Sequence, residues 1–272
     1  MILVTGATGN MGRHLVRHLR EAGAAVRAVT RDARKAEGMA SERVEIAAGD
    51  LTDPEFLERA FIGVRSLFTL LEVGDATAVL EAAGRAGVAR VVLVTSLLAQ
   101  TLPEGFVGQL SLGCEKVMRD RGLAGTVLRP WEFTTNTLAW ADEIRAGGVV
   151  RKPSAGLPSP AIDPADVAAI AAKALLEDGH IGRTYALTGP AELVPQDKIR
   201  ALSAVLGREL RFEENGDAEK LEQIRRTPDQ VSEGFGVCFM ASPGVLPTAL
   251  EVLGRPPRTY QEWAADNAGR FR

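Results

Sequence analysis

A glycine-rich turn near the N-terminus is the feature that most constrains the fold of this 272-residue chain. Gly6, Gly9 and Gly12 lie three residues apart, after the apolar run Ile2–Thr5 and before a helical stripe of apolar residues. A tight bend, a close approach of backbone to an anion and a helix packed closely on a sheet each need a glycine. Because a helix N-terminus also attracts anions, this context predicts a strand–turn–helix unit that holds a pyrophosphate. The alternative is a tight turn without a ligand.

Apolar runs typical of buried strands recur through the first half of the chain and alternate with segments of helical periodicity. The further runs are Ala25–Thr30, Val44–Ala47, Ser66–Leu71, Val91–Thr95 and Thr126–Leu128. Continuous apolar strands separated by helices indicate a parallel sheet covered on both faces. The fold class predicted is therefore α/β, a doubly wound parallel sheet of the Rossmann type.

The alternation loosens after Pro130, so residues 1–130 are predicted to form a dinucleotide-binding core. Residues 131–272 are predicted to be a small, mostly helical C-terminal region that covers the substrate and is interleaved with the core as one structural unit. Helices are expected there around Ala165–Leu176, Pro195–Val205, Asp217–Arg226 and Thr259–Ala268. Asp163 and Asp166 suit the first turn of one of them, since acidic side chains stabilise a helix N-terminus.

Composition excludes several kinds of function. The net charge of −3 lacks the basic surplus of a nucleic-acid binder. Two cysteines are too few for a disulfide framework, and His14 and His18 lack the glutamate of a zinc hydrolase motif, so no metal site is predicted. No apolar run approaches the ~18 residues of a membrane span. With no signal peptide at Met1, the sequence predicts a soluble, cytoplasmic protein with a small-molecule partner, as a monomer or homodimer.

The glycine spacing is Gly-x-x-Gly-x-x-Gly, and here the chain resembles the atypical short-chain dehydrogenase/reductases, specifically their NmrA-like, NAD(P)-binding branch. The resemblance covers nearly the whole chain. Its specific segments are Gly6–Gly12, Val26–Asp32, Gly49–Leu51, Val91–Ser96, Thr126–Pro130, Asp163–Val167 and Gly182–Gly189. It implies a Rossmann-type sheet with a small C-terminal part that shapes the substrate cleft.

The residues after the second strand bear on the choice of dinucleotide. An acidic residue there binds the ribose of NAD, whereas an arginine accommodates the 2′-phosphate of NADP. Arg31 comes first here and Asp32 second, which predicts NADPH in preference to NADH. The alternative is a solvated basic loop with Asp32 pointing into the site. By resemblance, Asp50 and Leu51 contact the adenine.

The full set of residues expected to hold the cofactor follows the ends of the predicted strands. It comprises Gly6, Thr8, Gly9, Asn10, Met11, Gly12, Arg31, Asp50, Leu51, Leu70, Leu71, Thr95, Glu115, Pro130, Trp131 and Phe133. Of these, Trp131 and Phe133 lie by resemblance beside the nicotinamide, and with Trp140 they would form an aromatic wall suited to a flat substrate. Ordinary core packing is the alternative for all three.

The usual proton donor of the wider family is absent. Ordinary members use a serine after strand five and a Tyr-x-x-x-Lys helix, but neither Tyr185 nor Tyr260 precedes a lysine by four residues. The candidates left for catalysis are Ser96, after the fifth strand, and Ser111, at the matching helical position. Glu115, four residues after Ser111, would hydrogen-bond a ribose hydroxyl. The alternative places Ser111 and Glu115 on a wet helix edge, beside the packed stripe that contains Leu110.

Two classes of function remain open from the sequence. The favoured one is an NADPH-dependent oxidoreductase that transfers hydride to a flat quinone or ketone, such as an aromatic metabolite, because these acceptors delocalise the developing charge and need little acid catalysis. The other is a non-catalytic NAD(P)-binding redox sensor or regulatory protein. The missing tyrosine favours the sensor, and the aromatic segment after Pro130 favours the enzyme.

Overall fold

The computed structural model describes residues 1–71, 75–152, 158–214 and 242–272. These residues form two compact units. The first unit comprises Met1–Pro130 and Val167–Ala186, and the second comprises Trp131–Asp166 and Leu187–Arg272. The helix predicted over Asp217–Arg226 lies outside the described residues.

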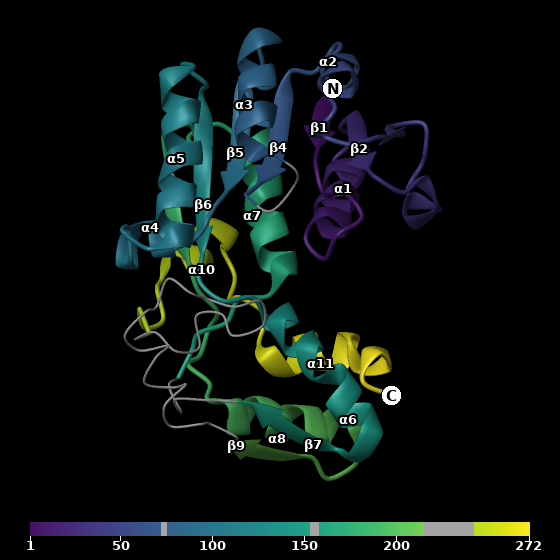
Figure 1. Cartoon of the computed structure of the whole chain (residues 1–272), viewed down its shortest axis with the longest axis vertical. Helices are drawn as coiled ribbons and strands as arrows, with labels where there is room; N and C mark the ends of the chain where they lie inside the picture. The colour runs from purple at the N-terminus through teal and green to yellow at the C-terminus, as the bar shows by residue number, and fades with distance from the viewer. Residues whose placement is uncertain (72–74, 153–157, 215–241) are drawn as a thin grey trace. The chain divides into compact units, whose positions relative to one another are not determined.

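A seven-stranded parallel sheet organises the first unit (Figure 1). Its order is β3-β2-β1-β4-β5-β6-β8. The bounds are β1 (Ile2–Val4), β2 (Val26–Thr30), β3 (Val44–Ala48), β4 (Ser66–Leu70), β5 (Arg90–Val94), β6 (Gly125–Pro130) and β8 (Thr184–Leu187). All six predicted strands are present. The seventh, β8, was not predicted and pairs with β6 through Val127 N to Arg183 O at 2.9 Å.

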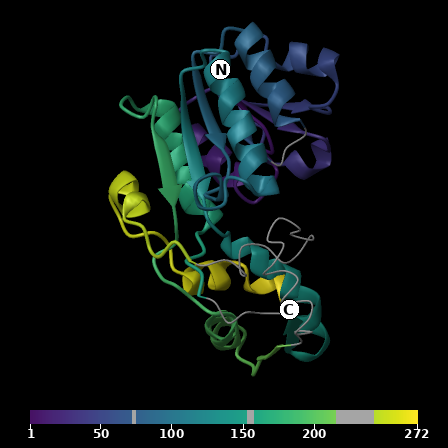
Figure 2. The same ribbon diagram turned by 60° about the vertical axis from the view of Figure 1, so that its left-hand side comes forward.

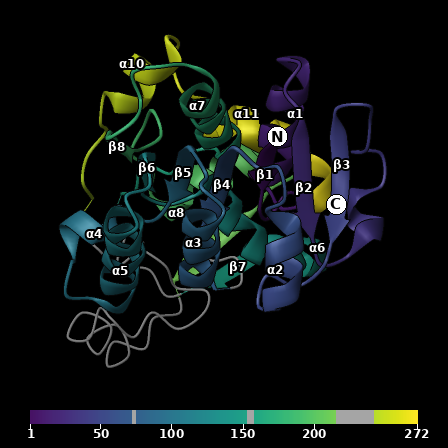
Figure 3. The same cartoon turned by 90° about the horizontal axis from the view of Figure 1, so that it is seen from above.

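Helices cover both faces of this sheet (Figure 3). One face carries α1 (Gly12–Glu21) and α7 (Pro164–Leu176), and the other carries α2 (Pro54–Ala60), α3 (Ala76–Arg85) and α5 (Phe106–Asp120). The short elements η1 (Ala33–Ala36) and α4 (Leu98–Thr101) follow β2 and β5. Strand residues such as Leu3, Leu67 and Leu93 are fully buried, as strands covered on both sides must be. The predicted doubly wound fold is confirmed.

The second unit has its own core (Figures 1 and 2). It contains a two-stranded parallel sheet, β7 (Val149–Lys152) and β9 (Arg211–Glu214). Its helices are η2 (Thr134–Trp140), α6 (Ala141–Gly147), α8 (Pro195–Leu206), α10 (Thr248–Leu253), α11 (Tyr260–Asp266) and η4 (Ala268–Arg270). Figure 2 shows the helices of the second unit from another side. Ile144, Val150, Leu202, Trp263 and Phe271 pack together there. Neither β7 nor β9 was predicted.

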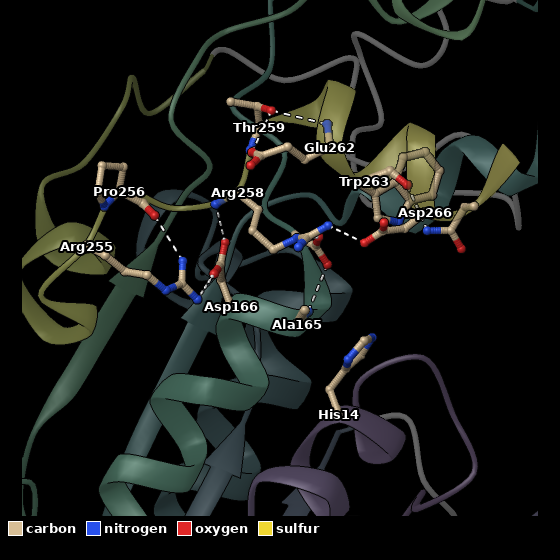
Figure 4. A network of polar contacts seen from close by, with 12 residues as sticks. His14, Ala165, Asp166, Arg255, Pro256, Arg258, Thr259, Glu262, Trp263 and Asp266 are labelled. Carbon is tan, nitrogen blue, oxygen red and sulfur yellow. Dashed lines mark hydrogen bonds and ion pairs between the residues drawn. The ribbon is translucent and has the colours of Figure 1, made fainter. Parts of the chain in front are cut away.

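Ion pairs tie the start of α7 to the C-terminal segment (Figure 4). Asp163 Oδ1 accepts from Ala165 N at 2.9 Å, and its other oxygen pairs with Arg258 Nε at 2.7 Å. Asp166, fully buried, accepts from Arg258 N at 2.6 Å and pairs with Arg255 Nη2 at 2.8 Å. Burial raises the pKa of Asp166. The two acids therefore begin the helix as predicted, and Arg255 and Arg258, which look scattered in the sequence, are their partners.

No helix in the described part of the chain is both long enough and apolar enough to cross a membrane.

Candidate functional site

The turn between β1 and α1 leaves little room for a side chain at its glycine positions. Gly6 has a φ of 60°, in the region that favours glycine. A Cβ on Gly12 would lie 2.1 Å from the Gly6 carbonyl oxygen, and one on Gly9 would lie 3.2 Å from the same atom. The backbone is thus compact enough for a phosphate to approach it closely.

The N-terminus of α1 has no side-chain cap and no acidic residue in its first turn. By contrast, α2 and α3 are capped by Asp53 and Asp75. An uncapped N-terminus keeps its partial positive charge and its N–H donors for an anion. Together with the compact glycine turn, this end of α1 fits a dinucleotide pyrophosphate.

Arg13 ties the glycine turn to the loop that follows β2. Its Nε donates to Thr8 O at 2.8 Å, and its Nη2 donates to Lys35 O at 3.0 Å. Thr8 Oγ1 and Thr30 Oγ1 lie 3.3 Å apart and add a second link. The guanidinium of Arg13 therefore donates to backbone carbonyls of both loops, and its role here is to hold the glycine turn and the loop after β2 together.

Arg31 and Asp32 differ sharply in their surroundings. Asp32 caps η1 by accepting from Arg34 N at 3.0 Å and pairs with the guanidinium of the same residue. The hydrogen bonds from Arg34 lower the pKa of Asp32. Arg31 is exposed and makes no hydrogen bond or ion pair with another described residue. Arg31 is thus the group available to an anion at this strand end, while the Asp32 carboxylate is occupied within its own loop.

Asp50 and Leu51 follow β3. Asp50 Oδ1 accepts from both the backbone N and the Oγ1 of Thr52, each at 2.9 Å. These bonds lower the pKa of Asp50, and the charge of Arg31 adds to the effect. Leu51 is buried. Asp50 is therefore an ionised, fixed acceptor on the same side of the sheet as Arg31.

The ends of β4 and β5 carry the next predicted residues. Leu70 and Leu71 are half-buried, and Leu71 N donates to Val94 O at 3.0 Å. Ser96 is half-buried, and its Oγ accepts from Leu98 N at 3.2 Å at the start of α4. Because that bond uses a lone pair, the hydroxyl proton of Ser96 remains available for donation.

Glu115 lies in a buried ion pair. Arg129 Nε donates to Oε1 at 2.9 Å and Arg129 Nη2 to Oε2 at 2.6 Å, while Thr95 Oγ1 donates to Oε1 at 3.1 Å. Only 3% of the Glu115 side chain is exposed. The contact joins α5 to the ends of β5 and β6.

The wet-edge interpretation of α5 is wrong. Ser111 and Glu115 are buried, whereas Leu110, expected in the packed stripe, is 43% exposed. The apolar periodicity predicted that the face of α5 containing Leu110 is buried. Glu115 must instead point inward, because its carboxylate pairs with Arg129. Ser111 Oγ is buried and has no hydrogen-bond partner among the described residues. An unsatisfied buried hydroxyl is costly, which makes Ser111 Oγ an unusual atom on the buried face of α5.

The residues after β6 belong partly to each unit. Pro130 O accepts from Leu97 N at 3.0 Å in the first unit. In the second unit, Trp131 is buried, and its Nε1 donates a hydrogen bond to Ser159 Oγ at 3.1 Å. The backbone of Phe133 forms an isolated β-bridge with that of Ile162. Trp140 stacks at a tilt on Phe212, with ring centroids 5.8 Å apart, beside the core of that unit. Trp140 is therefore a packing residue.

Sequence reasoning missed two polar features of the second unit. Lys198 Nζ lies 2.9 Å from both carboxylate oxygens of Glu132, and both side chains are buried. Thr134 Oγ1 is buried without a hydrogen-bond partner among the described residues. Lys198 shares the helical spacing of Pro195 and Leu202 on the buried face of α8. This spacing, which places the lysine on the apolar face of the helix, could have predicted from the sequence that Lys198 is buried.

In the first unit, the predicted cofactor residues share one edge of the sheet. The glycine turn, Arg31, Asp50 and Leu51 follow β1, β2 and β3, while Leu70, Leu71, Thr95 and Pro130 end or follow β4, β5 and β6. Strand order reverses between β1 and β4, which is where ligands bind in open α/β sheets. Trp131 and Phe133 belong to the second unit.

Known proteins resemble this chain over its whole length. A reductase of (4-alkanoyl-5-oxo-2,5-dihydrofuran-3-yl)methyl phosphate from Streptomyces griseus subsp. griseus is 38% identical, covering 100% of this chain and 99% of its own. An NAD(P)H azoreductase from Xenophilus azovorans is 33% identical with the same coverage.

Solved structures agree with the fold. An NADPH-dependent quinone oxidoreductase from Escherichia coli, complexed with NADPH, has a TM-score of 0.80 at 25% identity. The match covers 98% of this chain and 99% of that one. The NmrA-like family model matches residues 1–241. The chain therefore belongs to the NmrA-like family, as the motifs predicted.

Proposed function

We propose that this protein is an NADPH-dependent reductase that transfers hydride to a flat, conjugated acceptor, a quinone or ketone. The observation that carries the proposal is the compact glycine turn before the uncapped N-terminus of α1, at the point where strand order reverses. The relatives add support, because they include an NAD(P)H azoreductase and a (4-alkanoyl-5-oxo-2,5-dihydrofuran-3-yl)methyl phosphate reductase, and the similar structure is an NADPH-dependent quinone oxidoreductase.

The cofactor residues divide by the part of the dinucleotide they would hold. Gly6–Gly12, with Thr8, Asn10 and Met11 in that turn, bind the pyrophosphate, and Asp50 with Leu51 binds the adenine. Arg31 binds the 2′-phosphate, since a guanidinium matches phosphate in a bidentate fashion. Leu70, Leu71, Thr95 and Pro130 line the nicotinamide half, and Glu115 supports Thr95 through a hydrogen bond. Trp131 and Phe133 come directly after this set in the sequence. When bound, NADPH supplies the hydride.

Ser96 and Ser111 are the hydroxyls proposed to act on the substrate oxygen. Ser96 retains its proton for donation, and Ser111 Oγ is buried without a partner among the described residues. A serine hydroxyl is a weak acid and is not activated by a lysine here, so the developing negative charge must be delocalised on the substrate itself. Quinones, conjugated ketones and similar flat acceptors meet that requirement.

Calorimetric titration tests the cofactor assignment. Wild-type protein is expected to bind NADPH more tightly than NADH, and Arg31→Ala to weaken NADPH binding by about tenfold, the equivalent of about 1.4 kcal/mol. NADH binding stays unchanged. Arg34→Ala is the matched control, since Arg34 is paired with Asp32. Equal affinities for both cofactors, unaltered by Arg31→Ala, would show that Arg31 does not select NADPH.

Turnover tests the reaction. NADPH oxidation is measured with a panel of quinones and polycyclic ketones, following absorbance loss of the reduced cofactor. Steady oxidation with at least one acceptor is expected. Tight NADPH binding with no turnover across the panel would instead identify a redox sensor, which is the alternative that the absent Tyr-x-x-x-Lys pair favours.

A further inference from the structure

Hydrogen bonds from Arg129 and from Thr95 converge on the carboxylate of Glu115, beside the ends of β5 and β6. Arg129 donates to both oxygens of Glu115, and Thr95 Oγ1 donates to one of them. The side chains of Arg129 and Glu115 are 15% and 3% exposed. Three donor atoms thus converge on one buried carboxylate, which fixes its orientation.

The direction of the last bond follows from chemistry. An ionised carboxylate only accepts hydrogen bonds, so the single proton of the Thr95 hydroxyl must point at Glu115. Thr95 Oγ1 is left with lone pairs alone. A hydroxyl that is ordinarily both donor and acceptor is therefore held as an acceptor, because reversing it would set two acceptors against each other in a buried place.

Topology indicates which part of the cofactor this oxygen would meet. Arg31 and Asp50, proposed for the adenosine half, follow β2 and β3, on one side of the glycine turn. Thr95 directly follows β5, on the other side of the reversal in strand order. In this type of fold a dinucleotide extends across the reversal, so its second half, the nicotinamide riboside, lies towards β4, β5 and β6.

We infer that Thr95 Oγ1 accepts a hydrogen bond from a donor of the nicotinamide riboside and that Glu115 and Arg129 are positioning residues that hold it as an acceptor. The inference rests on the proposed function. That half of the cofactor carries two kinds of donor, the carboxamide NH₂ and the ribose hydroxyls. Both suit an oxygen that presents only lone pairs.

Binding of cofactor fragments tests this without turnover. Thr95→Val keeps the shape of the side chain and removes the oxygen. It is expected to weaken NADP⁺ by about fivefold to tenfold, the size of one hydrogen bond. Affinity for 2′,5′-ADP, which lacks the riboside, should not change. Thr95→Ser, which restores the hydroxyl, should recover NADP⁺ affinity.

Two analogues distinguish the donors. The 3-acetylpyridine analogue of NADP⁺ has no carboxamide NH₂, and 2′-phospho-ADP-ribose keeps the ribose without the nicotinamide ring. A Thr95→Val penalty that disappears with the acetylpyridine analogue identifies the carboxamide as the donor. A penalty that persists with both analogues identifies a ribose hydroxyl. A penalty shared with 2′,5′-ADP, or no penalty with NADP⁺, overturns the inference.

Glu115→Gln tests the positioning role. Glutamine removes the charge that directs the Thr95 proton, so NADP⁺ should bind more weakly while 2′,5′-ADP binding is retained. Because both changes act through one oxygen, adding Glu115→Gln to Thr95→Val should cause no further loss. If the two substitutions instead caused fully additive losses of NADP⁺ affinity, Glu115 would not act through Thr95, and its positioning role would be overturned. Failure of wild-type protein to bind either NADP⁺ or 2′,5′-ADP would refute the proposed function itself, which keeps the two failures distinct.

Discussion

Gly12 shows how much a single position can decide. Any side chain there meets the backbone of Gly6 and Ala7, and backbone cannot rotate away as a flexible side chain can. The three-residue spacing predicted this turn because the requirement is local. The burial of Glu115 was not predictable in the same way, since its partner Arg129 lies on a different element, β6.

Gly12→Ala is expected to lower the free energy of unfolding by about 1–3 kcal/mol, the usual cost of overpacking, and to abolish NADPH binding. Gly113→Ala is the matched control, because Gly113 lies in α5 with nothing within 4 Å of its Cβ position. That control should be neutral or stabilising by up to about 1 kcal/mol. Urea unfolding and calorimetry measure both effects. If the two variants had equal free energies of unfolding and equal NADPH affinities, Gly12 would not be required by the tight turn.

At the scale of elements, the sequence identified strands and helices whose apolar pattern is strong. The strands β7, β8 and β9 escaped because they are short and partly exposed, with Arg151, Glu213 and Glu214 among their residues. Such strands are specified by pairing partners distant in the sequence. They were not predicted because their pairing partners cannot be recognised from the local sequence. The central strands were predicted because burial on both faces requires continuous apolar runs.

The pair between α8 and the segment after β6 gives an element-scale prediction. Lys198→Met leaves the Glu132 carboxylate buried without its partner, so a loss of about 3–5 kcal/mol in the free energy of unfolding is expected. The double variant Glu132→Leu with Lys198→Met removes both charges and should be more stable than Lys198→Met alone. Chemical denaturation of the wild-type protein, the single variant and the double variant measures the three free energies of unfolding. A double variant less stable than the single one would contradict this account.

The first turn of α7 gives a prediction about pH. Burial raises the pKa of Asp166 above the value of 3.8 for an unperturbed carboxyl, so the folded state holds this proton more tightly than the unfolded state. The contribution of Asp166 to stability therefore falls as pH rises from about 4 through the raised pKa. The unfolding free energy of wild type minus that of Asp166→Asn should decrease over that range and then become constant. A difference that increases with pH would contradict the assignment.

For the molecule as a whole, the near-balanced charge and the fold were both accessible from the sequence, because composition and periodicity are averages over many residues. The sequence analysis placed a boundary after Pro130, but it did not identify Val167–Ala186 as the segment that returns to the first unit. Contact between chain segments, and not local pattern, sets that division.

Binding should stabilise the whole protein by mass action. At a NADPH concentration about 100 times its Kd, the expected gain in folding free energy is about 2.7 kcal/mol. The same concentration of NADH should give a smaller rise in Tm, and Arg31→Ala should narrow the gap between the two cofactors. Thermal unfolding followed by fluorescence measures all of these. Identical rises in wild-type protein would argue against selection for NADPH.

The route of the chain has a consequence for recombination among relatives. The polypeptide passes from one unit to the other after Pro130, after Asp166 and again after Ala186. A hybrid joined once at residue 131 would therefore import a foreign β8, replacing the native neighbour of β6 and with it part of the cofactor-bearing sheet. Exchanging the whole second unit between relatives therefore requires two separate donor pieces, 131–166 and 187–272, set around a retained native stretch.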